Sequence, residues 1–266
     1  MTPVYVTGVG LWAPGFASAA AFTAGVADPA VTTARAELYP GALRRRASPL
    51  SCMVASAAGE AVAQAGAALS ELPFVLASAY GEIGISVEMM ASFEEPEGLP
   101  SPTRFHNSVH NTAAAYVSIA TQNRGFSTAL SAGEETVAAT LCEAVALLHE
   151  DVPALVVTFA DEPTPPPFDR CRPPYAAAAA ALVLAAAPGP RPLARLTALR
   201  RGDPSARPAP LGQPFTHHPC AGALALVRAL CAGLAGPVAL GPPGPRGLEA
   251  VLELGPGLLR GPEADP

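Results

Sequence analysis

Apolar runs and helical repeats alternate along most of the chain. Short apolar runs bounded by glycine or proline are typical of buried strands, whereas apolar residues that recur about every 3.6 residues indicate helices. The runs predict strands over Pro3–Gly10, Pro73–Ala79, Phe126–Ala129, Pro153–Ala160, Tyr175–Ala187 and Leu248–Leu254. The repeats predict helices over Leu50–Leu69, Val109–Gln122, Glu134–His149 and Gly222–Leu234. This alternation indicates a layered α/β fold with a sheet between helices.

The segment Glu134–His149 carries the most regular helical repeat. Its apolar residues at this spacing are Val137, Leu141, Ala144, Val145 and Leu148. The acidic pair Glu134-Glu135 marks the start, because negative side chains stabilise the positive end of a helix. Alanine and leucine also occupy its other sides. We therefore predict that this helix is buried at the centre of the fold and that Cys142 packs within it as a small apolar side chain.

The C-terminal part of the chain carries a weaker signal. Proline and glycine become dense beyond Pro188, and we expect an irregular loop over Ala198–Pro214. A second loop, rich in glutamate and proline, is expected over Phe93–Pro102. The strand expected over Tyr175–Ala187 consists almost wholly of alanine, a poor strand former in isolation. Close packing between layers explains such a strand better than propensity does.

Few residues of this chain are charged. Charged residues make up 14% of the 266 residues, below the roughly 25% of an average soluble protein, and the formal net charge is −6. All 16 basic residues are arginine, and alanine, glycine and proline are abundant, which is typical of a GC-rich coding sequence. A surface covered by a partner is the alternative reason. The acidic balance and the short basic cluster Arg44–Arg46 argue against nucleic-acid binding.

Other features bear on location and redox state. The N-terminus starts directly into a strand pattern and does not resemble a signal peptide. The longest apolar run, Tyr175–Ala187, is shorter than the ~20 residues that cross a bilayer. The five cysteines are an odd number without metal-ligand spacing. We therefore predict a cytoplasmic protein without a membrane span, whose cysteines are reduced and mostly packed in the core.

Several stretches carry a resemblance to a known family. VYVTGVG (residues 4–10), GFSTALSAGEETVAATLCEAVALL (125–148) with PALVVTFADE (153–162), and PFDRCRPPYAAAAAALVLA (167–185) follow in this order. They resemble the N-terminal half of a β-ketoacyl synthase of the thiolase-like superfamily. The first stretch resembles the opening strand and turn of the synthase. The second resembles the nucleophile strand, elbow and buried helix, followed by the next strand. The third resembles the segment that carries a Phe-Asp, an arginine and a small-residue-rich strand. SPTRFHNSVHNTAAAYVSIATQNRG (101–125) resembles the short synthase-like proteins of aryl polyene and related pigment pathways, which are regarded as chain-length-factor-like subunits.

The resemblance implies a fold and a division of the chain. The implied fold is a thiolase-like layered α/β structure, with a mixed sheet between helices, whose N-terminal half is retained and whose C-terminal half is shortened. We expect a β-ketoacyl synthase-like N-terminal domain over residues 1–200 and a shortened remnant of the C-terminal half over residues 201–266.

The resemblance also places Leu130 at the position of the nucleophilic cysteine of active synthases. A leucine side chain forms no thioester, so the resemblance implies a non-catalytic subunit, without cofactor or metal. Active synthases take two histidines from their second half, for which only His217 and His218 are candidates here. As a chain-length-factor type of subunit in polyene, polyketide or fatty-acid-type biosynthesis, the chain is expected to form a heterodimer with an active β-ketoacyl synthase. It is expected to meet an acyl carrier protein through that complex.

The same resemblance implies that the helix and strand before Leu130 lie near the dimer surface. The residues expected to contact the partner or to line an acyl pocket are Ser108, Val109, His110, Asn111, Ala114, Phe126, Leu130 and Ser131. The small residues Ala113, Ala114 and Ala115 are expected to permit close approach of a partner helix.

The alternatives are an acyltransferase or hydrolase that uses Ser131 or Cys220, a dinucleotide-dependent enzyme, and a stand-alone acyl-binding module. Ser131 lacks a surrounding G-x-S-x-G pattern, so capping of the following helix is its preferred role. Cys220 with His217 and His218 is interpreted either as a thiol–imidazole pair or, preferably, as a junction between loop and helix. The TGVG turn lacks the full dinucleotide-binding pattern and its acidic residue.

Two further pairs have a functional and a structural interpretation. His106 and His110 lack further ligands at metal-site spacing, so hydrogen bonding of the loop and the helix start is the preferred role. Glu134 and Glu135 are interpreted either as a paired-carboxylate site or, preferably, as residues at a helix N-terminus of which one faces a loop or a partner.

Overall fold

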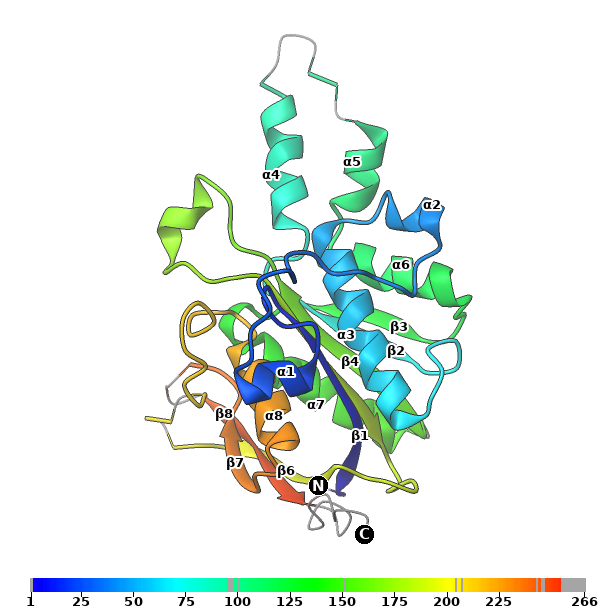
Figure 1. Cartoon of the computed structure of the whole chain (residues 1–266), viewed down its shortest axis with the longest axis vertical. Coiled ribbons are helices and arrows are strands. Elements are labelled where there is room, and N and C mark those ends of the chain that lie inside the picture. The colour runs from blue at the N-terminus through cyan, green and yellow to red at the C-terminus, as the bar shows by residue number, and fades with distance from the viewer. Residues whose placement is uncertain are drawn as a thin grey trace.

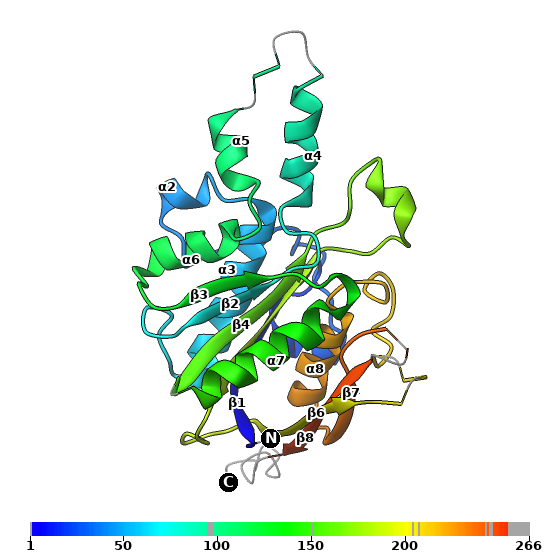
Figure 2. The same ribbon diagram turned by 180° about the vertical axis from the view of Figure 1, so that it is seen from behind.

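The computed structural model describes residues 2–94, 98–99, 101–150, 152–203, 205–206, 208–242, 244 and 247–254. Its strands are β1 (Val4–Trp12), β2 (Phe74–Ala77), β3 (Ser127–Leu130), β4 (Ala154–Asp161), β5 (Ala178–Ala185), β6 (Ala194–Arg201), β7 (Gly236–Ala239) and β8 (Leu248–Leu254). Its helices are α1 (Ala19–Ala24), α2 (Gly41–Arg44), α3 (Pro49–Ala65), α4 (Ile83–Ser92), α5 (Pro102–Asn107), α6 (Thr112–Thr121), α7 (Thr136–His149) and α8 (Ala221–Cys231), with 3-10 turns η1 (Gly133–Glu135) and η2 (Phe168–Cys171). Figures 1 and 2 show the strands in the middle with helices on both faces, which confirms the predicted layered α/β fold.

The described strands form one eight-stranded mixed sheet in the order β3-β2-β4-β5-β1-β6-β8-β7. β2 lies between β3 and β4 and pairs with both in parallel. The pairs that continue from β4 to β7 are antiparallel. The carboxyl ends of β2, β3 and β4 therefore meet at one end of the sheet, a common place for a functional site in α/β folds.

Each face of the sheet has its own core. α3 and α6 pack on one face, and α1, α7 and α8 lie on the other (Figures 1 and 2). The side chains of β5 alternate between them, so that Ala180 and Leu182 join one core while Ala181 and Val183 join the other. The sheet is thus buried on both sides over its central strands.

Strand β1 and helix α3 approach each other closely. A Cβ atom built on Gly8 would lie 2.1 Å from the carbonyl oxygen of Ala61, and one built on Gly10 would lie 2.0 Å from that of Ala57. Only glycine fits at these two positions. The alanine-rich strand β5 packs under the same helix. Close packing between layers therefore accounts for the alanines, as the sequence suggested.

Helices α4 and α5 form a hairpin that projects from the body of the molecule (Figures 1 and 2). Three of its apolar side chains, Met90, Phe93 and Phe105, are exposed. The loop predicted over Phe93–Pro102 joins the two helices and lies partly outside the described residues. Neither helix was predicted, because both are short and lack a strong apolar face.

The most regular predicted helix is present as α7, but the prediction that it is buried at the centre is wrong. Val137 and Leu141 pack against the sheet, whereas Ala139, Cys142 and Ala146 are exposed. The prediction that Cys142 packs as a core residue is therefore also wrong. Small apolar side chains on both sides of a helix suggest burial on both sides, yet the described part of the chain places no second layer over the outer side.

Most of the cysteines lie outside the core, contrary to the prediction. All are free thiols, but Cys142, Cys171 and Cys231 are exposed, and only Cys220 is buried. Two of the exposed cysteines lie at or near the ends of helical elements, and the apolar character of cysteine does not by itself decide which side of a helix faces the core.

Two predicted boundaries also differ from those in the structure. The helix predicted to reach Leu69 ends at Ala65, because Gly66 adopts the left-handed conformation that closes a helix. The irregular loop predicted from Ala198 starts only after Arg201. The residues before it belong to β6, because their backbone pairs with β1 and β8, and this pairing does not require an apolar side-chain pattern. Strand β7 was not predicted, because a proline lies within it.

The predicted division of the chain after residue 200 falls inside β6, and the sheet continues beyond it through β8 and β7. The last part of the predicted C-terminal remnant, from residue 255 onward, lies outside the described residues. The two-part division stays a prediction.

Candidate functional site

A buried carboxylate lies where the parallel strands end. Asp161 is the last residue of β4 and is fully buried. Its oxygens accept hydrogen bonds from Ser78 Oγ at 2.8 Å and from the N–H groups of Ala79 and Tyr80, both at 3.0 Å. Cys220 Sγ, at the start of α8, donates to Oδ2 at 3.2 Å. Asp161 thus joins the turn after β2 to the beginning of α8.

This carboxylate serves structure rather than ligand binding. Burial raises the pKa of Asp161, and the hydrogen bonds from Ala79, Ser78, Cys220 and Tyr80 oppose the rise. Both oxygens already accept from protein donors. No oxygen is left facing a cavity, so the group holds its neighbours in place.

The histidine and cysteine before α8 do not form a thiol–imidazole pair. His218 Nδ1 accepts a hydrogen bond from the backbone N–H of Cys220 at 3.0 Å, and its Nε2 donates to the carbonyl oxygen of Asp161 at 3.3 Å. The ring is therefore neutral, and burial lowers its pKa to about 4. Burial first, and then the charge of Asp161, raise the pKa of the Cys220 thiol well above its usual range. A buried, protonated thiol is a poor nucleophile.

The elbow between β3 and α7 carries Leu130 and Ser131. Leu130 ends β3 and is half-buried against the core that includes α7. Ser131 Oγ donates to the carbonyl oxygen of Ala79 at 3.0 Å, so the expectation that it caps the helix is wrong. Turn η1 separates it from α7, and Thr136 Oγ1 instead accepts from the N–H of Ala132 at 3.0 Å. Ser131 makes no hydrogen bond to a histidine among the described residues.

A cavity of about 480 Å³ lies between α6 and β3. Of the residues expected near the dimer surface, it brings together His110, Asn111 and Ala114, which lie opposite residues 127–129 of β3. His110 Nε2 also donates to the carbonyl oxygen of Ser78 at 2.9 Å. This bond fits the expected structural role of His110 in the loop before α6.

The remaining interface candidates divide between surface and core. Val109 and Phe126 are 45% and 48% exposed. Ala113 and Ala114 are buried, and they join the core that this chain's own α3 and α6 share. These two alanines therefore permit close approach of α6 to its own α3, and only Ala115 of the three is half-buried. Ser108 closes α5 by donating to the carbonyl oxygen of Phe105 at 2.9 Å.

Strand β3 forms one edge of the sheet, so one side of its backbone faces away from β2. The carbonyl oxygens of Phe126 and Leu130 accept hydrogen bonds from N–H groups on the β2 side. Main-chain groups of successive residues in a strand point to opposite sides, so Ser127 and Ala129 direct theirs outward. An edge with free N–H and C=O groups is a template for pairing with another strand.

Two carboxylates share the N-terminus of α3. Glu82 Oε1 accepts from Ser48 Oγ at 2.7 Å and from Ser51 Oγ at 3.2 Å, while its buried Oε2 has no partner among the described residues. Burial raises the pKa of Glu82 to about 7 and that of Glu162 to about 7, and the charge of Glu162 adds to the rise for Glu82. Both carboxyls therefore bind protons at a higher pH than exposed glutamates do.

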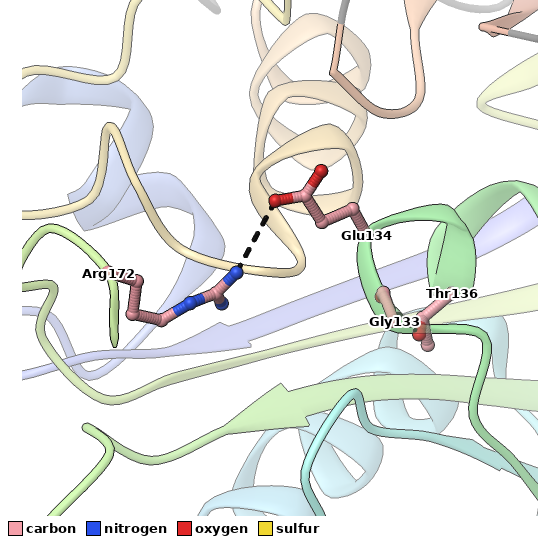
Figure 3. A network of polar contacts seen from close by, with 4 residues as sticks. All are labelled: Gly133, Glu134, Thr136 and Arg172. Carbon is pink, nitrogen blue, oxygen red and sulfur yellow. Dashed lines mark hydrogen bonds and ion pairs between the residues drawn. The ribbon is translucent and has the colours of Figure 1, made fainter. Parts of the chain in front are cut away.

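Arg172 is a cation that sequence reasoning did not single out. It follows η2 in the loop before β5, and its guanidinium carbon lies 4.9 Å from the centre of the Tyr80 ring. Figure 3 shows Arg172 and Glu134 pointing toward one another, with Nη2 of the arginine 3.4 Å from Oε1 of the glutamate. Glu134 and Arg172 both line a cavity of about 520 Å³ at the start of α8.

Asp161, Glu82 and Glu162 were also missed. Only Asp161 had a signal, since it ends an apolar run that was predicted to be a strand. Among the described residues, no group of histidine, cysteine, aspartate or glutamate side chains is arranged to hold a metal ion. No described helix combines the length and apolar character that a membrane span requires.

The sheet lies between two helical layers and an elbow precedes α7, as the resemblance to thiolase-like synthases implied. The sequence matches the family described as "Beta-ketoacyl synthase, N-terminal domain" over residues 19–231, which is most of the chain. The chain therefore belongs to the β-ketoacyl synthase N-terminal domain family. A search of curated proteins found no match by sequence.

Several solved structures share this fold. A chain of the complex between the ketosynthase ApeO and its chain length factor ApeC, from Xenorhabdus doucetiae, has a TM-score of 0.72 and 18% identity, and the match covers 94% of this chain and 99% of that one. A chain of the ishigamide ketosynthase/chain length factor has a TM-score of 0.63 and 18% identity, over 75% of this chain and 66% of that one. A chain of the AntDE:AntF complex of a type II polyketide ketosynthase with its acyl-carrier protein has a TM-score of 0.61 and 15% identity, over 75% and 68%.

Proposed function

We propose that this chain is a non-catalytic β-ketoacyl synthase-like subunit of the chain-length-factor type, which pairs with an active ketosynthase in polyene, polyketide or fatty-acid-type biosynthesis. The observation that carries the proposal is Leu130 at the end of β3, where the family resemblance places the nucleophile. Cys220 offers no substitute, because its thiol is buried and donates to Asp161. Ser131 makes no hydrogen bond to a side chain that could act as a base among the described residues.

Similarity to solved complexes supports the choice of partner. The ApeO–ApeC structure is a ketosynthase with its chain length factor, and this chain spans nearly the whole of the matching chain. The AntDE:AntF structure holds a ketosynthase with an acyl-carrier protein. We therefore expect an acyl carrier protein to reach this subunit through the ketosynthase.

The edge strand β3 and the cavity beside it support a place for that partner. The free backbone side of Ser127 and Ala129 offers pairing to a partner strand. The exposed side chains of Val109, Ile119 and Phe126 offer apolar contact nearby. An obligate heterodimer at this surface is expected to bury more than the roughly 1,600 Å² of a standard interface.

The absence of catalysis is tested by intact mass spectrometry after incubation with an acyl-carrier thioester. We expect no stable acyl adduct on this chain, because Leu130 forms no thioester. A stable mass gain that maps to Ser131 or Cys220 would support the acyltransferase or hydrolase alternative and would overturn the non-catalytic assignment.

Pairing through β3 is tested with two substitutions at one exposed position. Ser127→Pro removes the outward N–H, and edge strands tolerate proline there. Ser127→Ala keeps that N–H and serves as the control. We expect the proline variant to bind the co-expressed ketosynthase about tenfold more weakly, since a lost main-chain bond costs about 1 kcal/mol and the ring crowds the partner strand. Equal binding by both variants would show that β3 does not pair with the partner.

A further inference from the structure

Among the described residues, the cavity at the start of α8 combines apolar walls with one fixed cation. Its volume of about 520 Å³ lies within the range of small-molecule sites. Prolines, Ala209 and Leu211 form much of its wall. Its charged side chains are Arg172 and Glu134, and its histidines are His217 and His218. His218 is neutral because both ring nitrogens are held by backbone groups.

Arg172 is held in place mainly by aromatic rings. Its guanidinium lies 4.9 Å from the ring centre of Tyr80 and 5.9 Å from that of Tyr175. The side chain is only 17% exposed, and its buried Nη1 has no hydrogen-bond partner among the described residues. Cation–π contacts hold the guanidinium in place, and its Nη2 is the group that faces Glu134.

The existing partner of Arg172 is weakly bound. Glu134 Oε1 lies 3.4 Å from Nη2, and the Glu134 side chain is 63% exposed (Figure 3). An ion pair of this length that is open to water contributes between about 0 and 1 kcal/mol. An incoming anion therefore loses little by displacing Glu134.

The first turn of α8 adds to the preference for an anion. Ala221 and Gly222 begin this helix and line the same cavity. The N-terminus of a helix carries a partial positive charge. The N–H groups of Ala221, Ala223 and Leu224 already donate to carbonyl oxygens of the chain, so this turn contributes charge rather than hydrogen-bond donors. One arginine beside one helix N-terminus matches a carboxylate, which carries a single charge and accepts a charge-assisted hydrogen bond.

We propose that this cavity binds a monocarboxylate with an apolar body. The carboxylate replaces Glu134 on Arg172, and the apolar body lies along the proline-lined wall. Glu134 is thus a competing counter-ion that swings into water when the ligand enters. This inference does not depend on whether the chain pairs with a ketosynthase.

The test is isothermal titration calorimetry of the full chain with sodium octanoate. A ligand of ~10 non-hydrogen atoms is expected to bind with a dissociation constant of about 1 mM. Arg172→Gln should weaken octanoate at least about tenfold, because it removes the cation and its charge-assisted hydrogen bond. Glu134→Gln should tighten it about threefold, because it removes the competing carboxylate. Arg170→Gln, an exposed arginine in η2 outside the cavity, is the matched control and should change nothing.

The opposite signs at Arg172 and Glu134 separate this site from a folding defect, which weakens binding in both variants. Octanol tests the charge and should bind at least about tenfold more weakly than octanoate. Octyl phosphate tests the class of anion. Octanoate binding that is the same in wild type, Arg172→Gln and Glu134→Gln would overturn the site. Octanol binding equal to octanoate overturns the role of charge, and tighter binding of octyl phosphate overturns the carboxylate assignment.

Discussion

The polar cluster around Asp161 and the edge strand β3 lie at the same end of the sheet, but their polar groups are satisfied differently. Around Asp161 both carboxylate oxygens, the Cys220 thiol and both nitrogens of His218 are hydrogen-bonded within the chain. Along β3 the outward N–H and C=O groups of Ser127 and Ala129 face away from the sheet. The polar groups around Asp161 are therefore left with little to offer a ligand, whereas the outward groups of β3 could pair with the proposed partner.

Removal of the central carboxylate should have the largest effect on stability. Asp161→Ala leaves Ser78 Oγ and the N–H groups of Ala79 and Tyr80 buried without an acceptor. We expect the free energy of unfolding to fall by about 3–5 kcal/mol, measured by urea denaturation. Asp169→Ala, an exposed aspartate in η2, is the control and should fall within about 0.5 kcal/mol of wild type. A loss below about 1 kcal/mol at Asp161 would contradict the structural role of the cluster.

The paired carboxylates at α3 should make stability depend on pH. The pKa of Glu82 rises from 4.5 to about 7 on folding, so the folded chain retains protons that the unfolded chain releases. Its contribution is complete below pH 4.5 and is lost as the pH rises through 7. Glu82→Gln stays neutral and should therefore be more stable than wild type by about 2–3 kcal/mol at pH 8, with little difference at pH 4.5.

Urea denaturation of both proteins at several pH values measures this difference. His218 acts in the opposite sense, because its pKa is lowered to about 4 and its contribution is lost as the pH falls from 6.5 through 4. That contribution is the same in both proteins and cancels in the comparison. A Glu82→Gln variant that is no more stable at pH 8 than at pH 4.5, relative to wild type, argues against a raised pKa of Glu82 in the folded chain.

Substitutions on the outer side of α6 and β3 should change partner binding without changing stability. Ile119 is 61% exposed, and an aspartate there places a charge in the proposed interface. We expect Ile119→Asp and Phe126→Asp each to weaken ketosynthase binding at least tenfold, or about 1.4 kcal/mol, in a co-purification titration. Leu234→Asp, an exposed leucine just after α8, is the control and should bind normally. By contrast, Ala114→Arg should also destabilise the chain, because Ala114 is buried in it.

The smallest effect is expected at the elbow. Ser131→Ala removes one exposed hydrogen bond to the carbonyl oxygen of Ala79. We expect a loss of no more than about 1 kcal/mol in thermal unfolding, and ketosynthase binding within twofold of wild type. A large loss of complex activity with unchanged stability would point to a chemical role for Ser131 and would revive the enzyme alternative.

The sequence predicted the strands better than it predicted which surfaces are buried. The apolar run places β4 almost to the residue, because a strand buried on both faces needs a nearly continuous apolar run. The helical repeat also places α7. It does not distinguish a helix covered on both sides from one with small apolar residues on its outer side, such as Ala139 and Ala146.

The site was harder to predict because its contacts join distant segments. Cys220 meets Asp161 across 59 positions of sequence, and Arg172 meets Glu134 across 38. No spacing pattern in the sequence links such residues. Leu130 was identified only through the family resemblance, since a leucine at the end of an apolar strand is ordinary by itself.

The contact between β1 and α3 has a consequence for mutational drift. Glycine and alanine codons differ by a single base, and both residues are abundant in this chain. At Gly8 and Gly10 that simple exchange places a methyl group about 2 Å from a helix carbonyl oxygen. A saturation mutagenesis library is therefore expected to be depleted of alanine at these two codons, whereas the neighbouring strand β5 is built largely from the same residue.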